Sequence, residues 1–175
     1  MADDVEYKLW NMKFYAYVLV GTLALLFMAA GSKHAKLSEG LNPGDLAPRI
    51  EIPENGSDIT FRNSESRYTL LNFWAAYDAE SRLKNVQLSN AVKKMDSSKI
   101  AFYSVSLDEN PSVFKETVRL DQLPAGTQFQ VESGTESEIY KDYALEKGLR
   151  NFLIDGNGMI VAVNVAASDL EKILN

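Results

Sequence analysis

The stretch Tyr68-Thr-Leu-Leu-Asn-Phe-Trp74 decides the fold that we expect for this chain. It is a near-continuous apolar run, which is typical of a strand buried in the middle of a sheet. After it, up to about residue 95, apolar side chains such as Leu88 and Val92 recur at helical spacing. A second apolar strand is then expected over residues 100–107. This alternation of strand and helix predicts an α/β fold with parallel strands.

Weaker signals extend the pattern in both directions. Short strands with alternating polar and apolar residues are expected over residues 49–52 and 58–62, with an Asn-Gly turn between them. Asn110 and Pro111 predict the start of a helix that runs to about residue 120. The remaining expected elements are a helix over residues 136–145, strands over 151–154 and 159–163 around a turn at Asp155–Gly158, and a last helix that opens with a capping box at Ser168–Glu171. The closing hairpin makes part of the sheet antiparallel.

The composition excludes several classes of function. The chain has 175 residues, with 18 Lys and Arg against 24 Asp and Glu, and its net charge of −6 argues against a nucleic-acid binder. It has no cysteine, which excludes a thiolate nucleophile, a disulfide and an iron–sulfur cluster. The single histidine, His34, lies among lysines, where a solvated tail is favoured over a catalytic base. We expect no cofactor and no metal site.

Residues 14–32 carry no charge between Lys13 and Lys33. A helix of that length measures about 28 Å, close to the hydrocarbon thickness of a bilayer. The stretch is therefore interpreted as a transmembrane anchor or as the core of a signal peptide. The expected organisation is an extension with this segment over residues 1–32, a linker over 33–43 and a globular domain over 44–175. The end of the stretch also resembles a lipoprotein signal, with Ser32 where such signals have cysteine.

Four motifs carry a resemblance to a known family. They are Gly44-Asp-Leu-Ala-Pro48, Leu71-Asn-Phe-Trp-Ala75, Ser104-Val-Ser-Leu-Asp108, and Phe152-Leu-Ile-Asp155 followed by Gly158. In this order they resemble the membrane-tethered thiol–disulfide oxidoreductases of the TlpA-like branch of the thioredoxin superfamily. The resemblance covers residues 44–175. It implies a thioredoxin-like three-layer α/β sandwich with a mixed central sheet and an extra N-terminal strand pair.

The resemblance also implies that the redox site is lost. The family pattern Asn-Phe-Trp-Ala-Thr-Trp-Cys-Pro-Pro-Cys places its two cysteines on Asp78 and Ser81 of this chain. The family chemistry needs a thiolate at a helix N-terminus and a second thiol, and neither residue supplies one. The family's cis-proline falls on Leu149 or, with a gap of one, on Arg150. No proline follows Pro124, so a trans peptide bond is expected there.

The residues at the lost site leave three interpretations open. Asp78 is a good helix N-cap, and Glu80 suits the positive end of the helix dipole, which favours capping. The second interpretation is a polar recognition face, with Arg82 near its carboxylates and Arg150 within reach of one. Its residues are Trp74, Tyr77, Asp78, Glu80 and Arg150. The third is a hydrolytic carboxylate pair of Asp78 and Glu80. No residue is assigned as catalytic.

The expected function is that of a pseudoenzyme: a redox-inactive thioredoxin-like domain that binds or holds an envelope protein or peptide. Its expected location is the bacterial periplasm or the outer face of an envelope membrane, reached through residues 14–32 if they are not cleaved. One alternative is a paralogue of a working TlpA-like oxidoreductase that has lost its cysteines. The other is a non-thiol enzyme that uses Asp78 and Glu80. The segment Asp155–Gly158 is interpreted as a hairpin turn rather than as part of a calcium loop.

Overall fold

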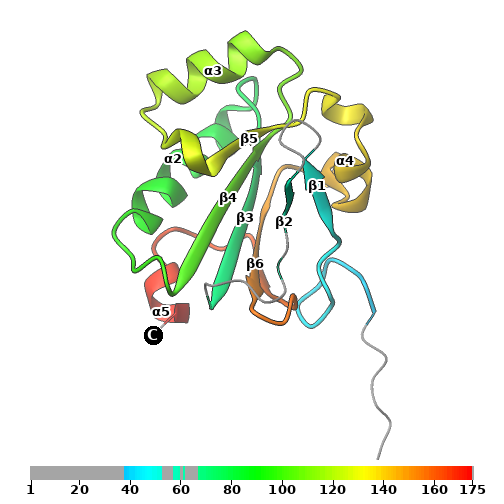
Figure 1. Cartoon of the computed structure of the whole chain (residues 1–175), viewed down its shortest axis with the longest axis vertical. Coiled ribbons are helices and arrows are strands. Elements are labelled where there is room, and N and C mark those ends of the chain that lie inside the picture. Colours follow the sequence, from blue (N-terminus) through cyan, green and yellow to red (C-terminus); the bar gives the residue numbers. More distant parts are fainter. Residues whose placement is uncertain (1–37, 53–56, 60, 62–66, 175) are drawn as a thin grey trace, which may run out of the picture. The chain divides into compact units, whose positions relative to one another are not determined.

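The computed structural model describes residues 38–52, 57–59, 61 and 67–174 (Figure 1). The uncharged stretch 14–32 and His34 lie outside these residues, as does the predicted Asn-Gly turn at residues 55–56. Within the described part, no helix is both long enough and apolar enough to cross a membrane.

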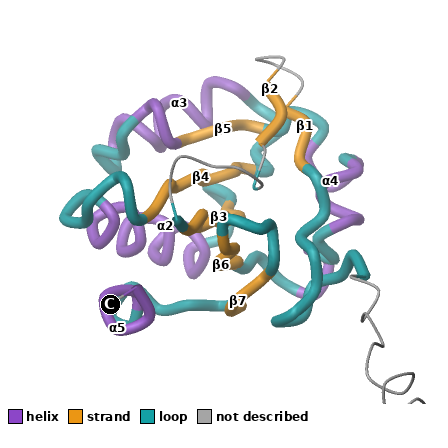
Figure 2. The backbone as a smooth tube through the Cα atoms, turned by 60° about the horizontal axis from the view of Figure 1, so that its bottom comes forward, coloured by secondary structure: helices purple, strands orange, loops and turns teal. Residues whose placement is uncertain are grey.

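Five strands form one mixed sheet in the order β5-β4-β3-β6-β7 (Figure 2). Their bounds are Tyr68–Trp74 for β3, Ile100–Ser106 for β4, Gln128–Gln130 for β5, Asn151–Asp155 for β6 and Ile160–Val163 for β7. Strands β3, β4 and β5 are parallel, whereas β6 is antiparallel to both β3 and β7. A separate antiparallel pair, β1 (Ile50–Ile52) and β2 (Ser57–Ile59), precedes the sheet. The predicted mixed sheet and N-terminal strand pair are therefore confirmed.

Helices and the strand pair cover the two faces of the sheet. The helices are α2 (Ala79–Val92), α3 (Pro111–Leu120), α4 (Glu138–Asp142) and α5 (Leu170–Leu174). Successive strand residues point to opposite faces, so Leu70 packs in a core with Leu88 of α2, whereas Leu71 packs in a second core with Tyr143, just after α4. Figure 2 shows α2 and α5 on one side of the sheet and α4 and β1 on the other. The expected three-layer architecture is present.

Two of the expected helices differ from the structure in their extent. The helix expected over residues 136–145 is broken into a 3₁₀ turn at Gly134–Glu136, the short α4, and a second 3₁₀ turn at Leu145–Lys147. The break arises because Ser137 is extended and caps α4, its Oγ accepting from the Tyr140 amide at 3.1 Å. The helix after β3 ends at Val92, three residues before the expected end.

The capping box expected at Ser168–Glu171 is absent. Helix α5 begins at Leu170, so Ser168 lies too early in the chain to be the N-cap residue. No side-chain hydrogen bond of Ser168 or Glu171 occurs in the described part of the chain. Strand β5 was not expected at all, since it is only three residues long and two of them are glutamine.

Candidate functional site

The first position that the family resemblance assigns to cysteine is a helix N-cap. Asp78 follows the short turn that leaves β3, and its backbone is extended, with φ −103° and ψ 100°. Its carboxylate Oδ1 accepts a hydrogen bond from the Ser81 amide at 2.7 Å. That amide is one of the four at a helix start that have no partner within the helix. The predicted capping role of Asp78 is confirmed.

The second position, Ser81, faces the interior and is only 3% exposed. Its hydroxyl donates to the Asp78 carbonyl at 3.1 Å and accepts from the Ala75 amide at 3.3 Å. Both hydrogen-bonding directions of the hydroxyl are therefore used by the turn that joins β3 to α2. Ser81 holds this turn together and is not presented to a substrate.

The charged residues around Asp78 have partners of their own. The Glu80 carboxylate is 79% exposed and pairs with Lys84 at 2.7 Å, one turn further along α2. Arg82 was expected near the carboxylates of this face, but its Nε and Nη2 donate to Asp121, at the end of α3, at 2.7 and 2.6 Å. This hydrogen bond raises the pKa of Arg82. Asp78 and Glu80 thus act separately, one as a cap and the other in a surface ion pair.

The resemblance assigns the family's cis-proline to Leu149 or Arg150, and the contacts at this position are the following. Among the described residues no peptide bond is cis, so the bonds that precede Leu149 and Arg150 are both trans, as expected. The Arg150 Nη2 donates to the carbonyls of Tyr143 at 3.3 Å and Ala144 at 3.1 Å. Its guanidinium also lies over the Phe152 ring, 5.6 Å from the centroid.

The prediction that Arg150 reaches a carboxylate is wrong. Its two hydrogen bonds in the described part of the chain go to backbone carbonyls just after α4, which ends at Asp142. Tyr143 is the C-cap residue of α4, and Ala144 opens the 3₁₀ turn that follows, where its carbonyl also accepts from the Lys147 amide at 3.2 Å. The Tyr143 and Ala144 carbonyls lie only seven and six residues before Arg150, so its guanidinium donates to them.

A buried carboxylate supports the turn from below. Asp108 is 5% exposed and follows β4, whose end lies beside the end of β3 because the two strands are parallel. Both of its carboxylate oxygens accept from the Ala76 amide at 3.0 Å, and the Ser106 hydroxyl donates to one of them at 2.7 Å. Tyr77, the next residue, is 69% exposed. Partial burial, and then the charge of Asp108, raise the pKa of the Tyr77 phenol.

A buried polar network lies between α2 and the sheet. The Asn85 Oδ1 accepts from Ser104 Oγ at 2.6 Å and from Asn72 Nδ2 at 3.3 Å. The Asn85 Nδ2 donates to Gln128 Oε1 at 3.0 Å. These hydrogen bonds connect α2 with β3, β4 and β5, and a satisfied network of this kind fixes how the helix lies on the sheet.

Neither this network nor the role of Asp108 is among the features expected from the sequence. The available signals were the spacing of Ser81, Asn85 and Ser89, which places polar groups on one side of α2, and the position of Asp108 directly after β4. Each signal becomes informative only when the neighbouring strand is known.

The structure divides the predicted recognition face into exposed and internal parts. Tyr77 and Glu80 are exposed, and Asp78 is half-buried as the cap. Trp74 is fully buried and packs on Phe114, with ring centroids 6.2 Å apart. Arg150 is half-buried and held by carbonyls. The side chains of this face that a partner could reach directly are therefore Tyr77, Glu80 and part of Asp78.

Neither a metal site nor a calcium loop is formed by the described residues. No group of three or more His, Asp or Glu side chains within them could hold a metal ion. The Asp155 Oδ1 instead accepts from the amides of Asn157 and Met159, both at 2.9 Å. This geometry closes the turn between β6 and β7, so the interpretation of Asp155–Gly158 as a hairpin turn is confirmed.

The fold is shared with solved bacterial structures. A thioredoxin-like protein from Parabacteroides distasonis is 56% identical, with a TM-score of 0.74, and the match covers 79% of this chain and 98% of that one. A thiol-disulfide oxidoreductase from Bacteroides fragilis is 28% identical, with a TM-score of 0.62 and coverage of 74% and 97%. The thioredoxin domain of a thiol-disulfide oxidoreductase from Bacteroides vulgatus is 22% identical, with a TM-score of 0.63 and coverage of 78% and 100%.

No protein-family model matches the chain, and no curated protein matches it either. The similarity to the protein from Parabacteroides distasonis nevertheless extends over nearly the whole of that protein, at well over half identity. The strand order and the separate strand pair agree with the fold that the resemblance implies. The chain therefore belongs to the thioredoxin-like family, whose relatives here include thiol-disulfide oxidoreductases, although its own sequence contains no cysteine.

Proposed function

We propose that this chain is a redox-inactive thioredoxin-like domain that acts as a binding module in the bacterial cell envelope. The observation that carries the proposal is the state of the two cysteine positions. Asp78 and Ser81 are both engaged in the cap and turn at the start of α2. Thiol–disulfide exchange requires an attacking thiolate, and these 175 residues contain none. The strand β3, the turn after it and the start of α2 are present, but they carry no thiol.

Tyr77 is the side chain best suited to contact a partner. Aromatic residues are enriched at protein interfaces, and this ring is 69% exposed on the turn that precedes α2. Asp108 and Ser81 bind the amides of the two residues before Tyr77, so the backbone that carries the ring is fixed. The partner we propose is an envelope protein or an extended peptide segment. Residues 14–32, if retained, would hold the domain at the outer face of a membrane.

The absence of cysteine makes a sharp test possible, because one introduced thiol can be labelled selectively. We would place a benzophenone on Tyr77→Cys in the full chain and irradiate it with envelope fractions of the source bacterium. The matched control is Lys172→Cys on α5, whose side chain is 78% exposed. The expected result is a defined crosslinked protein from position 77 and none from position 172.

Three outcomes would contradict the proposal. One is the same crosslinking pattern from both positions, and another is no product from position 77. The third is catalysis by the unmodified protein: insulin reduction above the buffer rate in metal-free samples would show that redox chemistry is present after all.

A further inference from the structure

Helix α3 carries more apolar surface than the described fold covers. Its apolar side spans residues 113, 114, 117, 118 and 120. Only Thr117, in the middle of this side, is buried. Val113 and Leu120 are 45% and 58% exposed. An amphipathic helix ordinarily buries its apolar stripe against the core, so the two flanks of this stripe are left for another contact.

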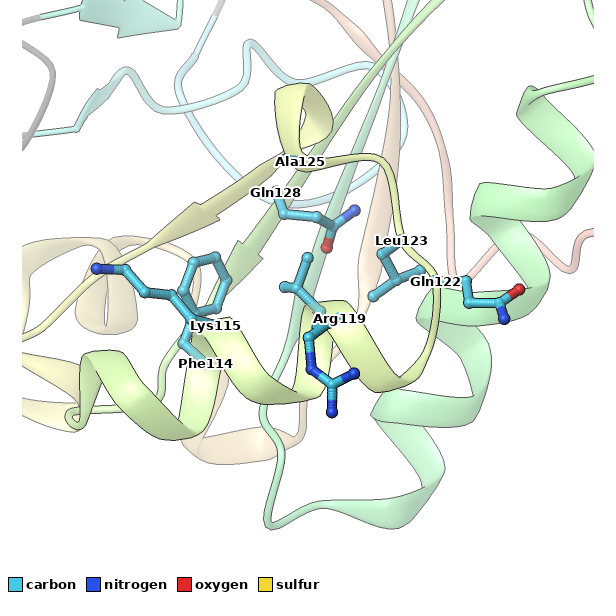
Figure 3. A pocket seen from close by; sticks show the side chains of 8 residues that line it. Phe114, Lys115, Arg119, Gln122, Leu123, Ala125 and Gln128 are labelled. Carbon is cyan, nitrogen blue, oxygen red and sulfur yellow. The ribbon is translucent and has the colours of Figure 1, made fainter.

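One flank opens into a pocket of about 590 Å³. The pocket lies between α3, the loop that follows it and β5 (Figure 3). Its apolar lining is Phe114, Val118, Leu123 and Ala125. The volume lies within the range of small-molecule sites, which are mostly apolar with a few polar groups that fix orientation.

The wall on the β5 side is polar and held in place. Gln128 is 7% exposed, and its amide oxygen accepts from Asn85 of α2. Its amide nitrogen donates to Thr127 Oγ1 at 3.1 Å. Since both ends of the amide have partners, the network under α2 extends to this wall and gives the pocket one fixed side.

The charge at the pocket is opposite in sign to that of the chain. The lining includes Lys115 and Arg119 and no carboxylate, although the chain has a net charge of −6. Arg119 is paired with Glu116, whereas Lys115 has no ion pair among the described residues. In Figure 3 the charged ends of Lys115 and Arg119 point away from Gln128, in two different directions. An apolar interior beneath a cationic rim complements an anion with an apolar body.

We propose that this pocket binds a small carboxylate with an aromatic body. The Phe114 ring supplies an aromatic wall for an offset or edge contact with the ligand ring, and Lys115 receives the carboxylate. The site is separate from the exposed Tyr77 face. Phe114 also packs on Trp74 at the end of β3, so occupancy of the pocket changes the surroundings of that indole.

The test uses 4-(trifluoromethyl)phenylacetate and the full chain in lipid nanodiscs, with empty nanodiscs as the blank. A ¹⁹F NMR titration should show saturable binding, and the neutral amide of the same compound should bind several-fold more weakly. Lys115→Glu should weaken binding of the carboxylate about five-fold or more, because it places a like charge at the rim. Lys141→Glu makes the same charge change on exposed α4 and should leave the affinity unchanged.

Two further measurements locate the site. Val118→Trp fills the pocket and should abolish binding, and Ala125→Trp serves the same purpose if the first variant fails to fold. In Trp10→Phe, Trp74 is the only indole, and its fluorescence should change with the same midpoint as the NMR signal.

The proposal is overturned by the absence of saturable binding, by equal binding of the amide, or by equal effects of Lys115→Glu and Lys141→Glu. Binding that survives the pocket-filling variant, or an unchanged Trp74 signal at saturation, also overturns it.

Discussion

The two segments that the family resemblance assigns to the redox site are held in place in different ways. At the start of α2, Asp78 bonds an amide three residues ahead, and Ser81 bonds back to the same turn. After α4, Arg150 reaches back six and seven residues to the carbonyls of Ala144 and Tyr143. The first is held by a local cap made by short side chains, and the second by a longer bridge made by a cation.

This difference explains why the predicted cap of Asp78 is confirmed and the predicted carboxylate partner of Arg150 is wrong. A short carboxylate at a helix start has few partners within reach other than the amides of the first turn. An arginine has a long stem and five donors, so its partners depend on which acceptors the tertiary structure brings within its reach. Here those acceptors are carbonyls where the chain turns sharply, with Ala144 at φ 47°. The sequence around Arg150 contains no sign of that turn.

The largest effect is expected from Arg150→Ala. The change removes two charge-assisted hydrogen bonds to carbonyls and the contact with the Phe152 ring. We expect a loss of about 2 kcal/mol in the free energy of unfolding, since hydrogen bonds to charged groups are the stronger ones. Urea denaturation followed by circular dichroism measures it.

Arg150→Lys is the matched control. It keeps the charge but not the planar group that bonds two carbonyls and stacks on a ring, so less than half of the loss should be recovered. A full recovery by lysine would mean that the charge alone matters. A loss below about 0.5 kcal/mol for Arg150→Ala would show that the hydrogen bonds of Arg150 do not stabilise the fold, because such values are typical of ordinary surface positions.

The second effect concerns Tyr143 and alkaline pH. Burial, and then the charges of Asp142 and Glu39, raise the pKa of the Tyr143 phenol far above its ordinary value of 10.0. The unfolded chain releases this proton near pH 10, while the folded chain keeps it. The stabilisation is therefore complete below pH 10 and is lost as the pH rises above it. Urea midpoints at pH 9 and pH 11 should show a steep fall.

Tyr143→Phe separates this residue from the other tyrosines. The variant loses the hydrogen bond from the phenol to the Pro48 carbonyl at 2.6 Å, which should cost about 1 kcal/mol at neutral pH. It should also lose part of the fall between pH 9 and pH 11. An equally steep fall in the variant would assign the alkaline sensitivity to other groups.

Most of the fold could be predicted because its main signals are local. The apolar run that became β3, the Asn110–Pro111 start of α3 and the turn at Asp155 each act through neighbouring residues. Strand β5 could not, because its three residues owe their state to the pairing of Val105 with Phe129 and its neighbours on β4. The break before α4 is instead local, because Ser137 caps that helix through the Tyr140 amide three residues ahead.

The candidate site follows the same rule. Asp78 was predictable as a cap from its position before a helix. The buried Asp108 and the Asn85 network were not, since their partners come from separate segments: Ala76 lies 32 residues from Asp108, and Gln128 lies 43 residues from Asn85. Polar residues that meet inside a fold carry no sign in the sequence of which partner satisfies them.

The third effect concerns the cap itself. Asp78→Ala leaves the first-turn amide of Ser81 without its acceptor, and we expect a loss of about 1 kcal/mol in the free energy of unfolding. Asp78→Asn should recover most of it, because asparagine is an equally good N-cap residue. Thermal and urea melts of the two variants measure the difference. A neutral Asp78→Ala combined with loss of the crosslinked partner would replace the capping role by a recognition role.

The smallest effect on the free energy of unfolding is expected from Glu80→Gln. This variant tests binding rather than stability. Glu80 is exposed and is paired with Lys84, which is itself 45% exposed, so the pair should contribute only a few tenths of a kcal/mol. Lys84→Gln and the double variant complete the cycle that isolates the pair. Because Glu80 lies beside the cap but supports little of it, its replacement alters the reachable face while leaving the fold unchanged. Reduced crosslinking from position 77 at unchanged stability would assign Glu80 to the partner contact, whereas a loss above about 1 kcal/mol would show that the start of α2 depends on both carboxylates.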